Sequence, residues 1–332
     1  MTKLLMAART RKAGAVGKLS LAKMVCMVFV FCAATAIVSP AQIFKTIATF
    51  DGSNGDSPYL MSLVQGTNGN FYGTTELGGA HGSGTVFKIT PGGTLTALYS
   101  FCALANCSDG ANPYAGLVQA TDGNFYGTTA GGGSRQYGTV FKITPAGTLT
   151  TLHSFNETDG ASPVGGLVQA TDGNLYGTTR GAYGQFPGTV FKITAAGTLT
   201  TLHGFNGTDG DNATGGLLQA TNGAFYGTTA VGGDLRLCGG SGCGTVFSVS
   251  MGLGPFVKTL PAAGEVGAKV IILGTKLTGA TSVSFNGTPA KFTVVSKSEI
   301  TTRVPRGATT GKIKVKTPHR TLLSNVPFRV RR

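Results

Sequence analysis

The feature that most constrains this chain is one motif that occurs four times. SLVQGTNGNFYGTT begins at Ser62, GLVQATDGNFYGTT at Gly116, GLVQATDGNLYGTT at Gly166 and GLLQATNGAFYGTT at Gly216. The starts lie 54, 50 and 50 residues apart. A period near 50 residues is typical of repeat architectures, in which each copy packs on its neighbours. A copied unit is usually a scaffold, so we expect function where the copies differ.

One unit, Gly116 to Phe155, reads as four short strands. GLVQAT, NFYGTT, GTVFKIT and LTTLHSF are runs rich in β-branched and aromatic residues, which favour strands. Asp122-Gly123 joins the first two runs and is a dipeptide favoured in two-residue hairpin turns. Four antiparallel strands followed by a linker are typical of a β-propeller blade. The sequence therefore predicts an all-β protein of propeller type.

The ends of the repeat region predict how the propeller closes. The fourth copy stops after its third strand, GTVFSVS, whereas FKTIATF at Phe44–Phe50 matches the fourth-strand sequence LTTLHSF. We therefore predict a four-bladed β-propeller over residues 42–250, closed by pairing Phe44–Phe50 into the last blade, which would remove its open edges. Two alternatives stay open: Phe256–Leu260 supplies the missing strand, or the hairpins form an open stack.

The repeats resemble a known family through GTVFKIT, NFYGTT and GTLTTLHSF. The family is the bacterial Gloeo-Verruco (GloVer) extracellular repeat, and the resemblance covers residues 43–250. DGNFY and DGNLY are also similar to a turn of NHL-like propellers. The GloVer resemblance implies a surface or secreted protein and points to no particular activity.

Residues 255–332 read as a separate, smaller domain. About seven short strands with turn signals between them predict an immunoglobulin-like sandwich. The segment resembles the IPT/TIG domain family in KVIILG, the SFNGTPA hairpin and the VPRGATTG turn before IKVKTP. That resemblance implies an adhesion, spacing or protein-contact module without catalytic residues of its own.

Residues 1–41 have the composition of a secretory signal peptide. Six basic and no acidic residues precede the apolar run Met24–Val38. Ser39-Pro40-Ala41 then offers small residues for cleavage. The alternative is an uncleaved membrane anchor, although the apolar run is shorter than the roughly 20 residues of a membrane-spanning helix. We expect a secreted or cell-surface protein that meets a membrane only through this segment, if it is not cleaved.

Four cysteines lie outside this leader, in two close pairs. We predict disulfides Cys102–Cys107 and Cys238–Cys243, although four cysteines allow three pairings. Export favours disulfides, and it disfavours the competing site, a zinc ion held by four thiolates. We expect no metal site and no cofactor: Asp and Asn in the linkers do not form a calcium loop. Motifs for nucleotide, zinc-protease or nucleophile-elbow chemistry do not occur.

Charge divides the chain sharply. Residues 42–254 hold 7 basic and 11 acidic residues, whereas residues 255–332 hold 14 basic residues against Glu265 and Glu299. Such a basic domain predicts an anionic polymer as its partner. The alternative is that the charge only maintains solubility. Nucleic acid is not expected, because the protein is exported and the domain offers neither a recognition helix nor an aromatic platform.

Candidate binding residues come from loops that differ between copies. In a propeller, the loops between second and third strands share a face with the linkers between blades, and variable loops on a rigid scaffold are typical of binding sites. Arginine and tyrosine side chains suit a sugar or an acidic peptide; solvated loops without a ligand are the alternative. The distinctive side chains are His81, Arg135, Tyr137, Arg180, Tyr183, Phe186, Asp234 and Arg236.

Two further sets of residues recur at equivalent strand positions. Gln65, Gln119, Gln169 and Gln219 are expected to form a structural hydrogen-bond ring rather than a ligand site. His153 and His203 stand where Tyr99 stands in the first copy and are expected to be packing residues.

These observations predict an exported, non-catalytic binding or scaffold protein whose partner is a polysaccharide or a cell-surface protein. No catalytic residues are predicted, since paired carboxylates at a constant site cannot be identified. The alternatives are a propeller-type polysaccharide lyase or hydrolase, and a purely structural envelope protein.

Overall fold

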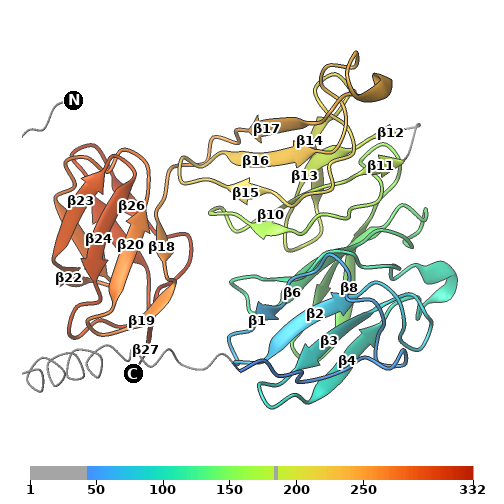
Figure 1. Cartoon of the computed structure of the whole chain (residues 1–332), viewed down its shortest axis with the longest axis horizontal. Coiled ribbons are helices and arrows are strands. Elements are labelled where there is room, and N and C mark those ends of the chain that lie inside the picture. Colours follow the sequence, from blue (N-terminus) through green and yellow to red (C-terminus); the bar gives the residue numbers. More distant parts are fainter. Residues whose placement is uncertain (1–42, 183–185, 332) are drawn as a thin grey trace, which may run out of the picture. The chain divides into compact units, whose positions relative to one another are not determined.

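The computed structural model describes residues 43–182 and 186–331 (Figure 1). The chain divides into two compact units, Met1–Thr46 and Ile47–Arg332. The predicted signal peptide, residues 1–41, lies outside the described residues. In the part of the chain that is described, no helix has the length and apolar character needed to span a membrane.

Each of the first three repeats forms an antiparallel sheet of four strands, as predicted. The first sheet contains β1 (Val64–Gln65), β2 (Phe71–Thr75), β3 (Thr85–Ile89) and β4 (Leu95–Ser100). The second contains β5 (Val118–Gln119), β6 (Phe125–Thr129), β7 (Thr139–Ile143) and β8 (Leu149–Ser154). The third contains β9 (Val168–Gln169), β10 (Leu175–Thr178), β13 (Thr189–Ile193) and β14 (Leu199–Gly204), with a small hairpin of β11 (Gly181–Ala182) and β12 (Phe186–Pro187).

Both faces of the inner strands are apolar, and the second and third sheets are each packed between two others. We call the face toward the preceding repeat the leading face and the face toward the following repeat the trailing face. In the second sheet, Phe125 and Phe141 lie on the leading face and share a core cluster with Tyr72 of the first sheet. Tyr126 and Val140 lie on the trailing face, in a cluster with the third sheet. Strand alternation thus produces two apolar faces, which explains the near-continuous apolar runs.

The same aromatic contact recurs between consecutive sheets. The last residue of each LTTLHSF-type segment packs edge-to-face on the central phenylalanine of the next repeat's third strand, a favoured geometry for aromatic rings. Ring centroids are 5.1 Å apart for Phe101–Phe141, 5.3 Å for Phe155–Phe191 and 5.1 Å for Phe205–Phe247. The chain therefore builds one interface three times.

Three of the four repeated glutamines link neighbouring sheets through hydrogen bonds. The backbone N–H of Thr67 donates to Gln119 Oε1 at 2.9 Å, and Thr121 donates in the same way to Gln169 at 2.9 Å. Thr171 donates to Gln219 at 3.2 Å. In contrast, Gln65 Nε2 donates to Gly69 O of its own turn. The glutamines therefore have a structural role, and their hydrogen bonds form a ladder between neighbouring repeats instead of the expected ring.

The fourth sheet has three strands, and the expected closed ring is not observed. Only β15 (Leu218–Gln219), β16 (Phe225–Thr229) and β17 (Thr245–Val249) pair (Figure 1). The proposed closing segment, Phe44–Phe50, forms no strand. Instead, Phe50 packs on Phe87 of the first repeat at 5.1 Å. The rival source of the missing strand, Phe256–Leu260, belongs to the C-terminal domain, where β18 (Lys258–Leu260) pairs with β20.

The physical reason lies in the interface itself. The three similar interfaces set the rotation from each sheet to the next. With this rotation, the trailing face of the fourth sheet remains exposed. Val246 is 79% exposed, whereas its equivalents Val86, Val140 and Val190 are fully buried. The predicted closure assumed that four units complete a turn, which a repeat period alone does not determine.

The C-terminal domain has the expected immunoglobulin-like fold. Two four-stranded sheets have the orders β18-β20-β24-β23 and β22-β21-β25-β26, and β19 pairs in parallel with β27. Val270, Phe285 and Phe328 belong to its single core cluster, which contains only residues of this domain. The remaining bounds are β19 (Ala263–Glu265), β20 (Lys269–Leu273), β21 (Ser282–Phe285), β22 (Thr288–Ala290), β23 (Phe292–Ser296), β24 (Glu299–Arg303), β25 (Ile313–Lys316), β26 (Thr321–Leu323) and β27 (Arg329–Arg331).

The glutamine ladder generates a matched pair of variants. Gln119→Ala removes an acceptor for the first repeat and should lower the free energy of unfolding by about 1 kcal/mol. Gln65→Ala removes only a bond to its own turn and should change it little. Urea unfolding followed by far-UV circular dichroism compares the two, and equal midpoints would contradict the inter-repeat role of Gln119.

Candidate functional site

The variable loops and the linkers between repeats lie at the same end of the sheets, as predicted. Backbone bridges join Asp56 to Leu77, Ala111 to Gly131 and Asp211 to Val231. In the third repeat, Gly181 N donates to Ala161 O at 2.9 Å. We call this side, formed by linkers and second-to-third-strand loops, the loop end.

An aspartate organises three of the linkers. His153 Nε2 and His203 Nε2 lie 2.8 Å from Asp159 Oδ2 and Asp209 Oδ2, and the Tyr99 hydroxyl donates to the equivalent Asp109 at 2.8 Å. The two histidine rings also pack edge-to-face on the phenylalanines two positions later. The histidines are therefore structural, as predicted. Among the described residues, no group of three or more His, Cys, Asp or Glu side chains is arranged to hold a metal ion.

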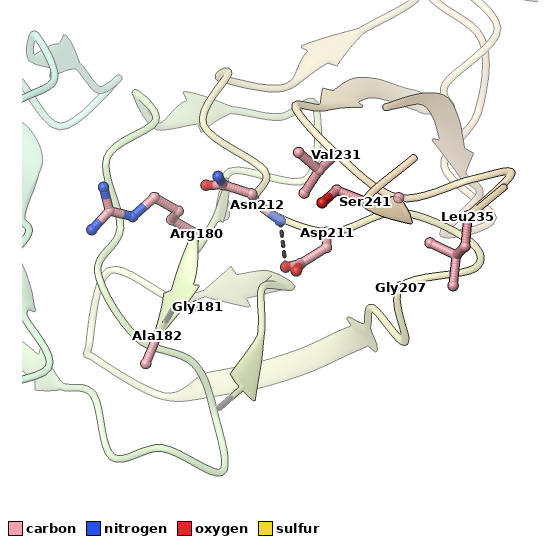
Figure 2. A pocket seen from close by; sticks show the side chains of 10 residues that line it. Arg180, Gly181, Ala182, Gly207, Asp211, Asn212, Val231, Leu235 and Ser241 are labelled. Atoms are coloured by element: carbon pink, nitrogen blue, oxygen red, sulfur yellow. Dashed lines mark hydrogen bonds between the residues drawn. The ribbon is translucent and has the colours of Figure 1, made fainter. Parts of the chain in front are cut away.

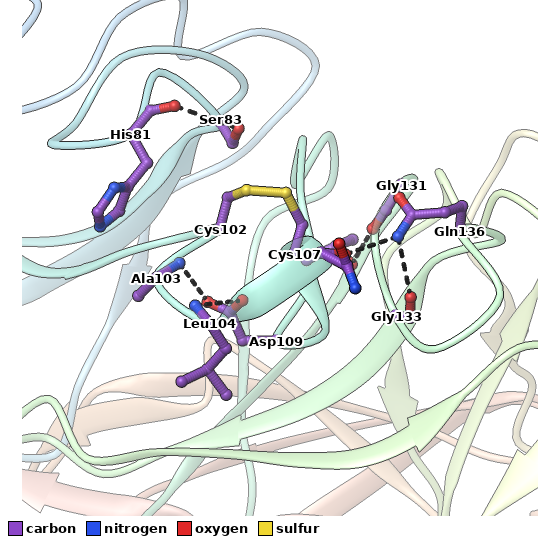
Figure 3. The surroundings of a disulfide bond; sticks show 12 residues. His81, Ser83, Cys102, Ala103, Leu104, Cys107, Asp109, Gly131, Gly133 and Gln136 are labelled. Carbon is purple, nitrogen blue, oxygen red and sulfur yellow. Dashed lines mark hydrogen bonds between the residues drawn. A yellow bond between two sulfur atoms is a disulfide. The ribbon is translucent and has the colours of Figure 1, made fainter.

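Both predicted disulfides are present at the loop end. Cys102–Cys107 spans the 3-10 turn η1 (Ala105–Cys107), and Cys238–Cys243 spans η2 (Cys238–Gly240). Figure 3 shows the first disulfide beside Gln136, whose amide donates to Asn106 O at 2.6 Å and to Gly133 O at 3.2 Å. The disulfide thus fixes a loop that the next repeat also holds.

Arg135 and Tyr137 line a pocket of about 380 Å³ at the second repeat. Ser134, Ser154, Asn156, Glu157 and Thr158 complete its lining. The Tyr137 hydroxyl donates to the Glu157 carboxylate, and this hydrogen bond raises the pKa of Tyr137. The tyrosine is therefore a neutral hydrogen-bonding and stacking group, with a guanidinium beside it in the same lining.

Arg180 lines a second pocket, of about 350 Å³, between the third and fourth repeats. Figure 2 shows Arg180 and Asn212 on one side of it and Leu235 on the other, with Asp211 and Ser241 between them. The side-chain oxygen Oδ1 of Asn212 is buried and has no hydrogen-bond partner among the described residues. Buried polar atoms are normally paired, so this oxygen is an unsatisfied acceptor in a residue that lines the pocket.

A third grouping joins loops of the first three repeats. A hydrogen bond to Glu76 raises the pKa of Tyr114, and burial raises it further. The charge of Arg180 lowers it. Glu76 and Arg180 are equivalent positions of the first and third repeats, where the second and fourth hold Ala130 and Ala230. Arg180 therefore lies where the loop ends of several repeats approach one another.

The remaining predicted residues do not join these pockets. Asp234 and Arg236 form an exposed ion pair at 2.7 Å, which lowers the pKa of Asp234. His81 is exposed and lies near the first disulfide (Figure 3). Tyr183 lies outside the described residues, and for Phe186 only the backbone, in β12, is described. The described candidates are thus divided among several places.

Sequence reasoning missed several residues of these groupings. Glu76 was detectable as a second charged residue at the repeat position of Arg180, and Tyr114 as an aromatic residue where the third and fourth repeats hold Val164 and Thr214. Asn212 could be recognised only from the structure. Its backbone φ of 59° is similar to the values of Ser57, Asn112 and Ser162 at the equivalent positions of the other repeats. Leu235 and Ser241 carry no sequence signal that distinguishes them from other loop residues.

The comparison with protein families decides the relationship. The model of the Gloeobacter/Verrucomicrobia repeat matches residues 33–247, which is more than half of the chain. The chain belongs to this repeat family. The IPT/TIG domain model matches residues 255–330, in agreement with the immunoglobulin-like fold of the C-terminal domain. No curated protein matches this member of the repeat family in sequence.

Solved structures give only distant likenesses. An auxiliary nutrient binding protein from Bacteroides ovatus is 23% identical with a TM-score of 0.21; the match covers 23% of this chain and 20% of that protein. A gluconolactonase from Xanthomonas campestris is 15% identical with a TM-score of 0.37, over 73% of this chain and 71% of that one. A putative oxidoreductase (glucose dehydrogenase) from Thermus thermophilus is 12% identical with a TM-score of 0.36, covering 82% and 93%. At these scores, no argument about function rests on them.

The disulfides generate a stability prediction. Replacing Cys102 and Cys107 together by serine should lower the free energy of unfolding by about 2–3 kcal/mol, because a short closed loop restricts the unfolded chain only modestly. Urea unfolding of the double variant against the oxidised wild type measures the difference. Peptide mapping under non-reducing conditions is the companion test, and free thiols or a pairing between the two loops would contradict the local bonds.

Proposed function

We propose that this repeat-family member is an exported, non-catalytic binding scaffold that holds a polysaccharide at its loop end. The observation that carries the proposal is the Arg180 pocket, with its buried, unpartnered Asn212 oxygen. Sugar hydroxyls are donors and acceptors at once, and a carboxylate, an amide and a guanidinium together match both roles. Leu235 and Val231 offer apolar surface to the sugar ring.

The second pocket supports the same chemistry. Tyr137 and Arg135 lie together at its edge, and such pairs bind sugars or acidic groups by stacking and by directed hydrogen bonds. A polysaccharide chain that contacts more than one repeat would gain affinity from each pocket, since linked sites raise the effective concentration of one another's ligands. A cell-surface protein that presents glycans is a partner of the same kind.

The enzyme alternative is less favoured by the lining of these pockets. A glycosidase needs two carboxylates flanking the scissile bond. Among the described lining residues, the Arg180 pocket has one carboxylate, Asp211, and the Arg135 pocket has one, Glu157, which accepts the Tyr137 hydroxyl. A structural envelope protein, the third alternative, would give no reason for an unpaired amide oxygen in a residue that lines a pocket.

The proposal includes an extracellular location and a propeller-like arrangement of the sheets. Membership of the repeat family, an IPT/TIG domain and two disulfides are consistent with an extracellular location, where disulfides persist. We also propose that the sheets act as blades of a propeller-like assembly. Residues 44–50 have the sequence of the strand that the fourth sheet lacks.

A glycan array with single-site variants tests the binding proposal. We expect wild-type protein to bind a subset of neutral or acidic oligosaccharides, and Arg180→Ala or Arg135→Ala to reduce affinity for that subset by tenfold or more. Arg236→Ala is the control, because its guanidinium is already paired with Asp234. Absence of any glycan binding would contradict the proposal, and turnover of a bound glycan would favour the enzyme.

The basic C-terminal domain is a second binding surface, and we propose an anionic polymer as its partner. The three ion pairs found among the described residues all lie in the repeats. Lys269 pairs across the sheet with Arg303, and both are exposed. Like charges in directly opposite positions are unfavourable, so an anion bound between them would stabilise the pair. Lys314 and Lys316 are exposed on the other sheet.

Salt dependence separates binding from mere solubility. Because the core cluster of the domain is self-contained, residues 255–332 should fold alone and be retained on a dextran sulfate column at low salt. Retention should fall steeply toward physiological salt, since polyanion binding releases counterions. Residues 42–250 should not be retained. Equal retention of the two fragments, or none of the basic one, would contradict the proposal.

A further inference from the structure

The two ends of the repeat array carry the two halves of the internal interface. On the fourth sheet, the trailing residues Tyr226 and Val246 are 37% and 79% exposed, whereas their equivalents in the other sheets are at most 1% exposed. On the first sheet, Leu63 is 51% exposed, whereas Leu117, Leu167 and Leu217 are buried. Each end therefore exposes part of the surface that its counterpart covers at every internal junction, although Phe87 and Ile89 of the first sheet are already buried.

Residues 47–50 already occupy the place of an outer strand from a preceding sheet. The Phe50 ring packs on Phe87 as Phe101 packs on Phe141, with the same 5.1 Å separation. The Ile47 carbonyl lies beside Gly93 as the Leu98 carbonyl lies beside Gly147. Both glycines have positive φ and leave no room for a Cβ atom. This segment is thus positioned for a sheet that would precede the first.

The fourth sheet is a sheet of the required kind. Among residues 43–182 and 186–331, no outer strand pairs beyond β17, and no apolar neighbour covers its trailing face as one does in each other sheet. Terminal repeats of soluble arrays usually have a polar outer face, but this one exposes a valine and a tyrosine. An open strand edge next to an apolar face is a template for pairing with another chain.

We infer that the trailing face of the fourth sheet docks on the first sheet of a second copy of this chain, whose residues 44–50 become the missing outer strand. A second copy can repeat the internal interface without altering any of the three that exist. Closure within one chain would require all three to change, because with the present interfaces the ends remain exposed. Such a head-to-tail contact is heterologous and gives a closed ring of chains when its rotation closes.

The internal sheets give the register of the new strand pair. Val140 opposes His153 and Val190 opposes His203, and the repeat alignment makes Val246 equivalent to the valines and Ala48 to the histidines. The inference therefore places Ala48 of one chain directly opposite Val246 of the other.

Cysteine cross-linking of full-length protein tests this. Chains carrying only Ala48→Cys, mixed with chains carrying only Val246→Cys and mildly oxidised, should form a disulfide-linked dimer. Val295→Cys, on an edge strand of the C-terminal domain and 56% exposed, is the matched control and should not cross-link with Ala48→Cys. Light scattering of wild-type protein should give at least twice the mass of one chain.

Two outcomes would overturn the inference. A cross-link within single chains of the Ala48→Cys/Val246→Cys double variant, with none in the mixture of single variants, would show closure inside one chain. Monomeric wild type without cross-linking in either experiment would show that the faces do not meet. Val246→Lys adds an independent measurement: it should abolish the larger mass, whereas Val295→Lys should preserve it. Glycan binding is read separately, so its failure does not affect this result.

Discussion

The burial of both faces of each sheet against its neighbours is the constraint on which the repeat region depends. A sheet of four short strands has too little apolar surface of its own, and it becomes stable only when a following sheet covers it. The phenylalanine contact repeated between Phe101 and Phe141, and at the two later junctions, sets the spacing of this stack. Gly127 fits the same junction, since a Cβ atom there would meet Phe141 and Leu117.

This constraint leaves one end of the sheets free to vary. Residues that contact a neighbouring sheet must be alike in every copy, whereas residues of the loop end need only close their loops. Aspartates such as Asp159 complete that closure with a few hydrogen bonds to the linker, and two disulfides add local restraint. The remaining loop positions can therefore differ between copies, which is why the candidate pockets occur there.

The sequence was sufficient for features determined by local pattern and insufficient for those determined by packing between copies. Strands, hairpin turns, both disulfides and the position of the linkers beside the variable loops follow from spacing and residue type. Closure of the ring did not follow from them. The rotation between sheets depends on how side chains such as Phe141 pack against the neighbouring sheet, and the repeat period does not determine that rotation. The convergence of Glu76, Tyr114 and Arg180 depends on that same rotation, so the site could be placed on a loop end but not assembled.

The C-terminal domain shows what an end of the array requires. Lys258 Nζ donates to Gln219 O at 2.7 Å, and Phe256 N donates to Thr221 O at 3.0 Å, so the domain satisfies backbone groups at the turn of the fourth repeat. These contacts reach the turn and leave Val246 exposed. A folded domain placed directly after the last repeat thus satisfies polar groups at this turn, but the apolar trailing face of the fourth sheet still needs a surface shaped like the first repeat. In a chain built from one repeated interface, that surface is already encoded at the other end.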